Sequence, residues 1–134
     1  MLAQQYVKNP HLINGLKYDL RVYVLVTSFC PLQVYVYNEG LVRFATEPYN
    51  LHPGSLQKKF VHLTNFSVNR KNHRFVQNND QHNHSDGEDC DEQSKWDFKQ
   101  LEQAYQKLDI SWQSVFQKIK SIVVKTLICV EPTI

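Results

Sequence analysis

The sequence predicts a mixed α/β fold of the layered α+β kind, in which an antiparallel strand meander is followed by packing helices. Two patterns support this class. Residues 19–46 alternate apolar and polar side chains at strand spacing, whereas residues 98–130 repeat apolar side chains every three or four positions. A chain of 134 residues is long enough for one compact unit with a core. We therefore expect a single domain over residues 1–134.

The strands are predicted over residues 19–27, 32–38 and 41–46. A turn at Pro31 joins the first two, and the run Asn38-Glu39-Gly40 is typical of a second turn. Such short connections favour antiparallel neighbours. We expect a meander of three strands.

Charged side chains mark one face of the first strand. Residues two apart in a strand point the same way, so Lys17, Asp19 and Arg21 share a face. The other face is expected to line the core and consists of Leu20, Val22, Val24 and Val26. Two cations around an anion suit an anionic ligand such as a nucleotide, although a solvated sheet edge has the same pattern.

Polar composition sets the middle of the chain apart. Residues 47–60 contain Pro48, Pro53 and Gly54 and are predicted to be a loop. The stretch at about 77–94 is rich in acidic residues and His, and we expect a mobile loop because it has almost no apolar residues to bury. It matches no metal-ligand spacing, so no metal site is predicted.

Charge is unevenly distributed along the chain. Six of the 13 acidic residues lie within residues 80–92, which contain no Lys or Arg; the other 121 residues carry 15 basic and seven acidic side chains, a net of +8. A basic body attracts acidic partners such as a nucleotide, a nucleic acid or an acidic polypeptide.

Two helices are predicted at the end of the chain. Phe98, Leu101, Tyr105 and Leu108 form the first apolar stripe. The second begins after Asp109 and comprises Trp112, Val115, Phe116, Ile119, Ile122, Val123, Leu127 and Val130. Both are interpreted as packing helices. The chain ends soon after Pro132 without a strand to follow the long helix, which predicts a fragment of a larger fold.

The cysteines and the hydropathy of the sequence indicate the cellular compartment in which we expect the protein. Cys30, Cys90 and Cys129 have unrelated spacings, so we predict reduced thiols. No apolar run reaches the length of a membrane span, and the first residues lack a basic-then-apolar signal segment. We expect a cytosolic or nuclear protein without membrane insertion.

Several spaced motifs occur in one order across nearly all of the chain. They are Gln4-Gln5-Tyr6-Val7-x-x-Pro10, Lys17-Tyr18-Asp19-Leu20-Arg21, Gly40-Leu41-Val42-Arg43-Phe44-Ala45-Thr46, His62-Leu63-Thr64-Asn65-Phe66-Ser67-Val68-Asn69, and Lys95-Trp96. In this arrangement the chain resembles the tubulin tyrosine ligase-like family, most closely its polyglutamylase branch. The resemblance implies an ATP-grasp fold and an enzyme that uses ATP and Mg²⁺ to join glutamate to the C-terminal tails of tubulin. Free glutamate and microtubules would be its partners, and the cytoskeleton, with the cilium or basal body, its location.

The resemblance also implies an ATP site. Gln4, Gln5, Tyr6 and Val7 match the segment that lies along adenine. The other matched ATP-contacting positions are Lys17, Asp19, Thr64 and Asn65. Lys17 would meet phosphate and Asp19 the ribose hydroxyls.

Further matched positions imply an amino-acid site and catalytic cations. Arg43, Ser67 and Lys95 match residues that hold the incoming amino acid. Phe66 stands where the family usually has tyrosine, so one hydrogen bond to the amino acid is expected to be missing. Arg21 and Lys17 are the expected catalytic cations, stabilising charge that develops on phosphate.

The family's upstream phosphate-binding lysines and its downstream acidic Mg²⁺ ligands have no counterpart in residues 1–134. The chain alone is therefore expected to be an incomplete catalyst. Two other functions stay open at this point, a truncated inactive paralogue that binds tubulin and a tubulin glycylase. RNA binding is a further alternative, because the aromatic side chains of Tyr23, Tyr35, Tyr37 and Phe44 on strands could stack on bases. Their positions on mixed faces, without an RNP-like run, argue against a nucleic-acid partner.

Overall fold

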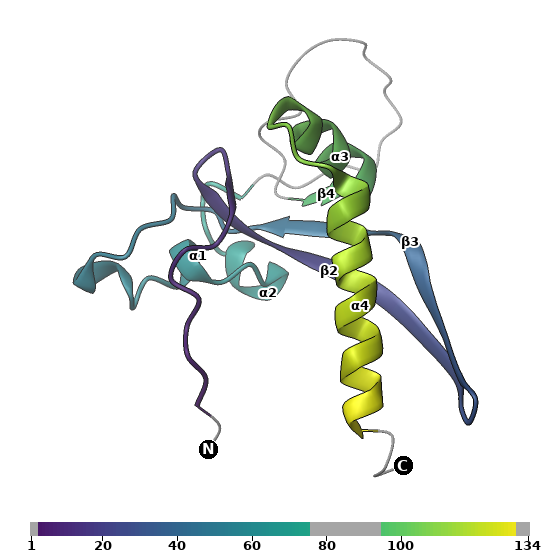
Figure 1. The fold of residues 1–134 in the computed structure, drawn as a ribbon. Helices are drawn as coiled ribbons and strands as arrows, with labels where there is room; N and C mark the ends of the chain where they lie inside the picture. Colours follow the sequence, from purple (N-terminus) through teal and green to yellow (C-terminus); the bar gives the residue numbers. More distant parts are fainter. Residues whose placement is uncertain (1–2, 76–94, 131–134) are drawn as a thin grey trace. The chain divides into compact units, whose positions relative to one another are not determined.

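The computed structural model describes residues 3–75 and 95–130 (Figure 1). Their strands form one sheet in the order β1-β2-β3-β4. The elements are β1 (Leu12–Ile13), β2 (Leu16–Phe29), β3 (Leu32–Phe44), a short 3-10 turn (Pro53–Ser55), α1 (Lys59–His62), α2 (Phe66–Asn69), β4 (Lys95–Asp97), α3 (Phe98–Lys107) and α4 (Trp112–Val130). Strands followed by helices confirm the predicted mixed α/β class.

The long β2-β3 hairpin dominates the sheet, and its turn lies at Cys30-Pro31 as predicted (Figure 1). Before it, β1 pairs antiparallel with β2, so that Leu12 lies opposite Lys17. The tight turn between β1 and β2 holds Asn14 at φ 50° and Gly15 at φ 73°, a left-handed conformation that Asn and Gly adopt most readily.

The predicted turn at Asn38-Glu39-Gly40 is wrong, because β3 runs unbroken from Leu32 to Phe44. Gly40 is buried inside this strand. A Cβ atom at this position would lie only 2.5 Å from the carbonyl oxygen of Arg21 and 2.6 Å from a ring carbon of Phe98. Glycine is therefore used here for close approach of a ring and a strand, a role that the sequence pattern does not distinguish from a turn.

The chain divides into two compact units, residues 1–20 with 42–96, and residues 21–41 with 97–134. The first unit has a core of Ile13, Val42, Phe44, Ala45, Val61 and Trp96. Within it, the ring centroids of Phe44 and Trp96 lie 4.7 Å apart. The second unit buries Phe98, Leu101, Tyr105 and Phe116. Each unit therefore has its own apolar centre.

Both predicted helices are confirmed. Helix α3 begins with a capping box, in which the Asp97 carboxylate accepts the Gln100 backbone N–H at 2.8 Å and the Gln100 side chain accepts the Asp97 N–H at 3.0 Å. Helix α4 starts at Trp112, whose ring centroid lies 5.0 Å from that of Phe98 and 5.4 Å from that of Phe116. These rings attach α4 to α3 at its first turns.

Two predicted apolar faces are less buried than expected. On β2, Leu20, Val22 and Val26 are half-buried and Val24 is exposed, so this face does not form the core. On α4, Ile122 and Val130 are exposed. Alternation and helical periodicity give the direction of a side chain, but burial also needs an element that covers it.

Cys30 and Cys129 are free thiols, as predicted, and the structure places both at exposed positions. Cys90 and the loop predicted at 77–94 lie outside the described residues. Among the helices that the structure describes, none is long and apolar enough to span a membrane.

Candidate functional site

Lys17 on β2 is held by neutral oxygen atoms. Its Nζ donates to the backbone carbonyl of His62 at 3.0 Å and to the Tyr6 hydroxyl at 3.2 Å. The ammonium also lies 4.9 Å from the centroid of the Tyr6 ring, within the range of a cation–π contact. The conformation of Lys17 is therefore fixed from two segments far apart in the sequence.

The His62 side chain connects Tyr6 to the turn at Ser55. Its Nε2 lies 3.0 Å from the Ser55 carbonyl oxygen, and its Nδ1 lies 2.9 Å from the Tyr6 hydroxyl. Because a carbonyl only accepts, we assign the proton of the neutral ring to Nε2, and Nδ1 then accepts from Tyr6. The Tyr6 oxygen in turn accepts from Lys17. The result is one directed chain from Lys17 through Tyr6 and His62 to Ser55.

Tyr49 packs on the same histidine. The two ring centroids lie 5.5 Å apart in an edge-on arrangement, and the Tyr49 hydroxyl donates to the Lys8 carbonyl at 2.8 Å. Desolvation, with the neighbouring Tyr6 as a second cause, raises the pKa of the Tyr49 phenol above its ordinary value of 10.0. The phenol is therefore neutral at physiological pH and acts here as a hydrogen-bond donor.

Asp19, two residues after Lys17, pairs with Arg43 on β3. The Arg43 Nε donates to Asp19 Oδ1 at 2.8 Å, and Nη2 donates to Oδ2, which makes the pair bidentate. The Arg43 side chain is 19% exposed and that of Asp19 is 36% exposed. The planar guanidinium is thus oriented by a carboxylate at partial burial.

The ion pair of Asp19 with Arg43 determines which of the nearby cations has a carboxylate partner. In residues 3–75 and 95–130, the only ion pair is that of Asp19 with Arg43. The carboxylate on the face predicted from the sequence therefore pairs with Arg43, and among the described residues the hydrogen bonds of Lys17 go to neutral oxygens, without a carboxylate. Such a cation is suited to an anionic ligand.

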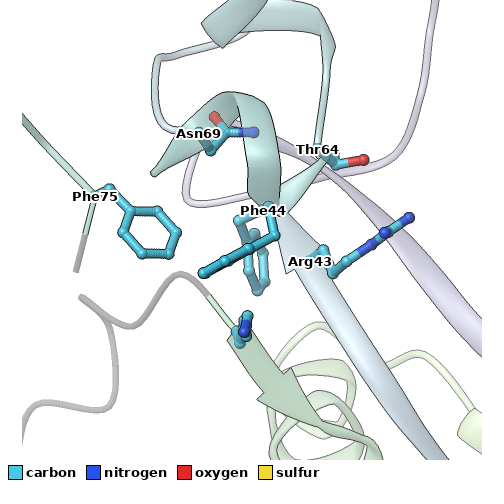
Figure 2. A pocket seen from close by; sticks show the side chains of 7 residues that line it. Arg43, Phe44, Thr64, Asn69 and Phe75 are labelled. Carbon is cyan, nitrogen blue, oxygen red and sulfur yellow. The ribbon is translucent and has the colours of Figure 1, made fainter. Parts of the chain in front are cut away.

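Beside Arg43 lies a hollow with aromatic walls (Figure 2). Its lining comprises Arg43, Phe44, Thr64, Phe66, Asn69, Phe75 and Lys95. Figure 2 shows Arg43 on strand β3, Thr64 on the segment that leads into α2, and Asn69 on α2 itself. The hollow therefore combines strand and helix residues from separate parts of the first unit.

The Lys95 ammonium lies over the ring of Phe66. The Lys95 Nζ lies 4.2 Å from the ring centroid, and the Phe75 ring meets Phe66 edge-on at 5.5 Å. The ring that replaces the usual tyrosine thus still contacts one of the two cations predicted to hold the amino acid.

Asn69 was not predicted as a site residue, yet it organises the segment before it. It is 1% exposed, and its Nδ2 donates to the carbonyls of Leu63 at 2.7 Å and of Asn65 at 3.1 Å. Its Oδ1 accepts from the Thr46 hydroxyl at 2.9 Å. The two bonds to Leu63 and Asn65 fix the backbone on both sides of Thr64, and the third connects Asn69 to Thr46. The sequence shows only that a polar residue, Asn69, follows Asn65 by four positions. That this side chain is buried becomes evident only in the fold.

About half of the predicted site residues meet in the first unit. Lys17 contacts the segment before Thr64, and the remaining contacts around the hollow gather Asp19, Arg43, Thr64, Phe66 and Lys95. Asn65 and Ser67 are exposed at the start of α2, and Gln4, Gln5 and Val7 are exposed on the N-terminal segment. Arg21 is exposed and belongs to the second unit. Its role stays a prediction.

Comparison with known proteins identifies the family. A model of the tubulin-tyrosine ligase family matches residues 1–133. The chain belongs to this family. Tubulin monoglutamylase TTLL4 of Mus musculus is 43% identical over 132 residues, which are 98% of this chain and 10% of that protein.

Other members of the tubulin-tyrosine ligase family are also similar. Tubulin polyglutamylase TTLL6 of Mus musculus is 39% identical over 100% of this chain and 15% of its own length. Tubulin polyglutamylase ttll-5 of Caenorhabditis elegans is 35% identical over 100% of this chain and 18% of its own length. The chain thus spans only a small part of the curated relatives it matches.

Proposed function

We propose that the protein containing this chain is an ATP-dependent ligase that joins glutamate to the glutamate-rich C-terminal tails of tubulin. The observation that carries the proposal is the similarity of the whole chain to proteins named tubulin monoglutamylases and polyglutamylases, at 35–43% identity. Tubulin is then the protein substrate, and the microtubule cytoskeleton is the place of action, at cilia or basal bodies as well.

The positive charge of Lys17 supports an ATP site, and we propose that this site belongs to an ATP-grasp fold. Lys17 offers an ammonium that no described carboxylate neutralises, which fits a polyphosphate. Thr64 and Asn65 follow directly on the segment that fixes Lys17. We assign the adenine side to Gln4, Gln5, Tyr6 and Val7, and we assign Asp19 to the ribose. Mg²⁺ is proposed as a further requirement, with its ligands outside residues 1–134.

The second group of residues supports an amino-acid site. Arg43 and Lys95 line one hollow with Phe66, and Ser67 follows Phe66 in the sequence. Glutamate brings two carboxylates, and each loses water on binding and needs a cationic partner. We assign Lys95 to the side-chain carboxylate of glutamate, a contact that glycine lacks, and Arg43, whose charge is shared with Asp19, to the backbone carboxylate.

The proposed reaction has two steps. An acceptor carboxylate on the tubulin tail attacks the terminal phosphorus of ATP, ADP leaves, and an acyl phosphate forms. The amine of free glutamate then attacks the acyl carbon, phosphate leaves, and an isopeptide bond remains. Lys17 and Arg21 are assigned to stabilise the charge on the phosphoryl oxygens.

The test is incorporation of labelled glutamate into purified tubulin by the full-length protein, with and without ATP. We expect incorporation that needs ATP and that Lys17→Ala lowers at least tenfold, a loss of about 1.4 kcal/mol of binding to the transition state. Lys99→Ala, at an exposed position of α3, is the matched control and should retain activity. Activity that is independent of ATP, or equal in the two variants, would contradict the proposal.

A further inference from the structure

We propose that His62 is a positioning residue that holds the Lys17 ammonium ready for a polyphosphate ligand. The inference rests on the proposed function for the identity of that ligand. It concerns a side chain that the motif comparison left without a role. His62 acts on Lys17 along two routes, one through its backbone and one through its imidazole.

The backbone route is direct. The His62 carbonyl accepts a hydrogen bond from Lys17 Nζ at 3.0 Å. This carbonyl belongs to the last residue of helix α1, whose terminal carbonyls have no partner within the helix and are open to other donors. The short helix therefore presents an oxygen to Lys17 at a fixed place.

The side-chain route passes through Tyr6. The Tyr6 hydroxyl donates to His62 Nδ1 at 2.9 Å and, because its proton is used there, offers its lone pairs to Lys17 at 3.2 Å. The imidazole is held on its other side by the Ser55 carbonyl at 3.0 Å and by the edge-on ring of Tyr49. His62 thereby fixes both the position of the Tyr6 oxygen and the direction in which it accepts.

The consequence concerns how Lys17 is used. Two of its three N–H donors meet neutral oxygens, and within the described residues no carboxylate pairs with it. The ammonium is thus oriented without being neutralised. A flexible lysine loses rotamer freedom when it binds a ligand, and a lysine that is already held loses less.

The variants separate this role from a merely structural one. His62→Phe keeps an aromatic ring beside Tyr49 but removes both ring hydrogen bonds, whereas His62→Asn keeps an acceptor close to the place of Nδ1. Tyr6→Phe removes the intermediate hydroxyl. His52→Asn, at an exposed histidine of the same loop, is the matched control.

Two measurements on the full-length protein test the proposal. The first is the rate at which a small acylating reagent labels Lys17, with Lys99 as the internal reference, and it needs no nucleotide. The second is the affinity for ATP by calorimetry, together with the KM for glutamate.

We expect His62→Phe and Tyr6→Phe to speed Lys17 labelling and to weaken ATP binding about two- to tenfold, the effect of one hydrogen bond. The KM for glutamate should be unchanged, and His62→Asn should recover most of the ATP affinity. Adding His62→Phe to Tyr6→Phe should have little further effect, because both interrupt the same chain.

Unchanged Lys17 labelling in both variants would overturn the proposal, as would equal losses for ATP and glutamate. If His62→Phe does not fold, Tyr6→Phe against His62→Asn still decides the matter, since only the first should release Lys17. A parent protein that binds no ATP overturns the proposed function instead, and the labelling rates still test whether His62 holds Lys17.

Discussion

The Asp19–Arg43 pair offers the sharpest test of the site geometry. Asp19→Asn keeps the size of the side chain but removes its charge, and so turns a bidentate ion pair into at most a neutral hydrogen bond. Arg43→Gln makes the converse change. If the pair forms as in the structure, the two substitutions affect the same interaction and their effects on stability will not add.

The magnitude follows from partial burial. Fully exposed pairs contribute about 0.2–1 kcal/mol, whereas breaking a buried pair costs about 3–5 kcal/mol. Side-chain exposures of 19% for Arg43 and 36% for Asp19 place this pair between these limits. After discounting for solvent screening, we expect Asp19→Asn to lower the free energy of unfolding by about 1–2 kcal/mol, with a coupling energy of about 1 kcal/mol.

The assay is equilibrium urea unfolding of the parent, both single variants and the double variant, at low and at high salt. Glu39→Gln, at an exposed acid of the same hairpin, is the control and should change stability by less than about 0.5 kcal/mol. Additivity within about 0.3 kcal/mol would show that the pair does not form in solution. It would also remove the reason for treating Lys17 as the unneutralised cation.

Ligand binding by the same variant separates two roles of Asp19. If its carboxylate binds the ribose, Asp19→Asn weakens ATP binding at least tenfold, or about 1.4 kcal/mol. If Asp19 only orients Arg43, the KM for glutamate rises while the ATP affinity stays the same.

Three further predictions concern other residues. Gly40→Ala should destabilise the protein by at least about 1–3 kcal/mol, since its Cβ would meet the Arg21 carbonyl and the Phe98 ring, whereas Gly54→Ala, which meets nothing within 4 Å, should change the melting temperature little. Phe66→Leu should raise the KM for glutamate about two- to fivefold through loss of a cation–π contact of about 0.5–1 kcal/mol with Lys95, while Phe66→Tyr keeps the ring, restores the missing hydroxyl and should lower the KM by about two- to tenfold, the effect of one hydrogen bond; equal values for both variants would refute this role of the ring. Tyr49 has a folded-state pKa above its unfolded value of 10.0, so its contribution to stability is complete below pH 10 and is lost as the pH rises through the folded pKa. Urea unfolding of the parent and of Tyr49→Phe between about pH 9 and pH 11 should therefore converge at the alkaline end, and parallel curves would argue against the shift.

Sequence patterns predicted best those elements whose stabilising contacts join residues close together in the sequence. Helix α3 has an amphipathic stripe and a capping box, and α4 has a long apolar repeat, so both were found close to their observed bounds. The β2-β3 hairpin followed from alternation around Pro31. The turn predicted at Gly40 was wrong because glycine is required there for another reason. The fold brings the ring of Phe98, which is distant in the sequence, close to this position.

The site residues also divide into those that the sequence predicted and those whose contacts only the fold reveals. Strand alternation placed Lys17, Asp19 and Arg21 on one face, and the resemblance added Arg43 and Lys95. Neither source could show that Asp19 pairs with Arg43 rather than with a lysine, since the partner lies 24 positions away on the next strand. The roles of His62 and Asn69 were missed for the same reason, because a polar residue becomes informative only when its buried partners are known.

The central claim is that the protein ligates glutamate to tubulin, and a competition measures it most directly. The full-length protein is incubated with tubulin, ATP and equal concentrations of labelled glutamate and glycine, and the modified tail peptides are identified by mass spectrometry. One additional charged contact discriminates by about 1.5–3 kcal/mol, so glutamate should be preferred about 10- to 150-fold, and Lys95→Ala should reduce that preference. A preference for glycine, or tails that remain unmodified in the presence of ATP, would contradict the account.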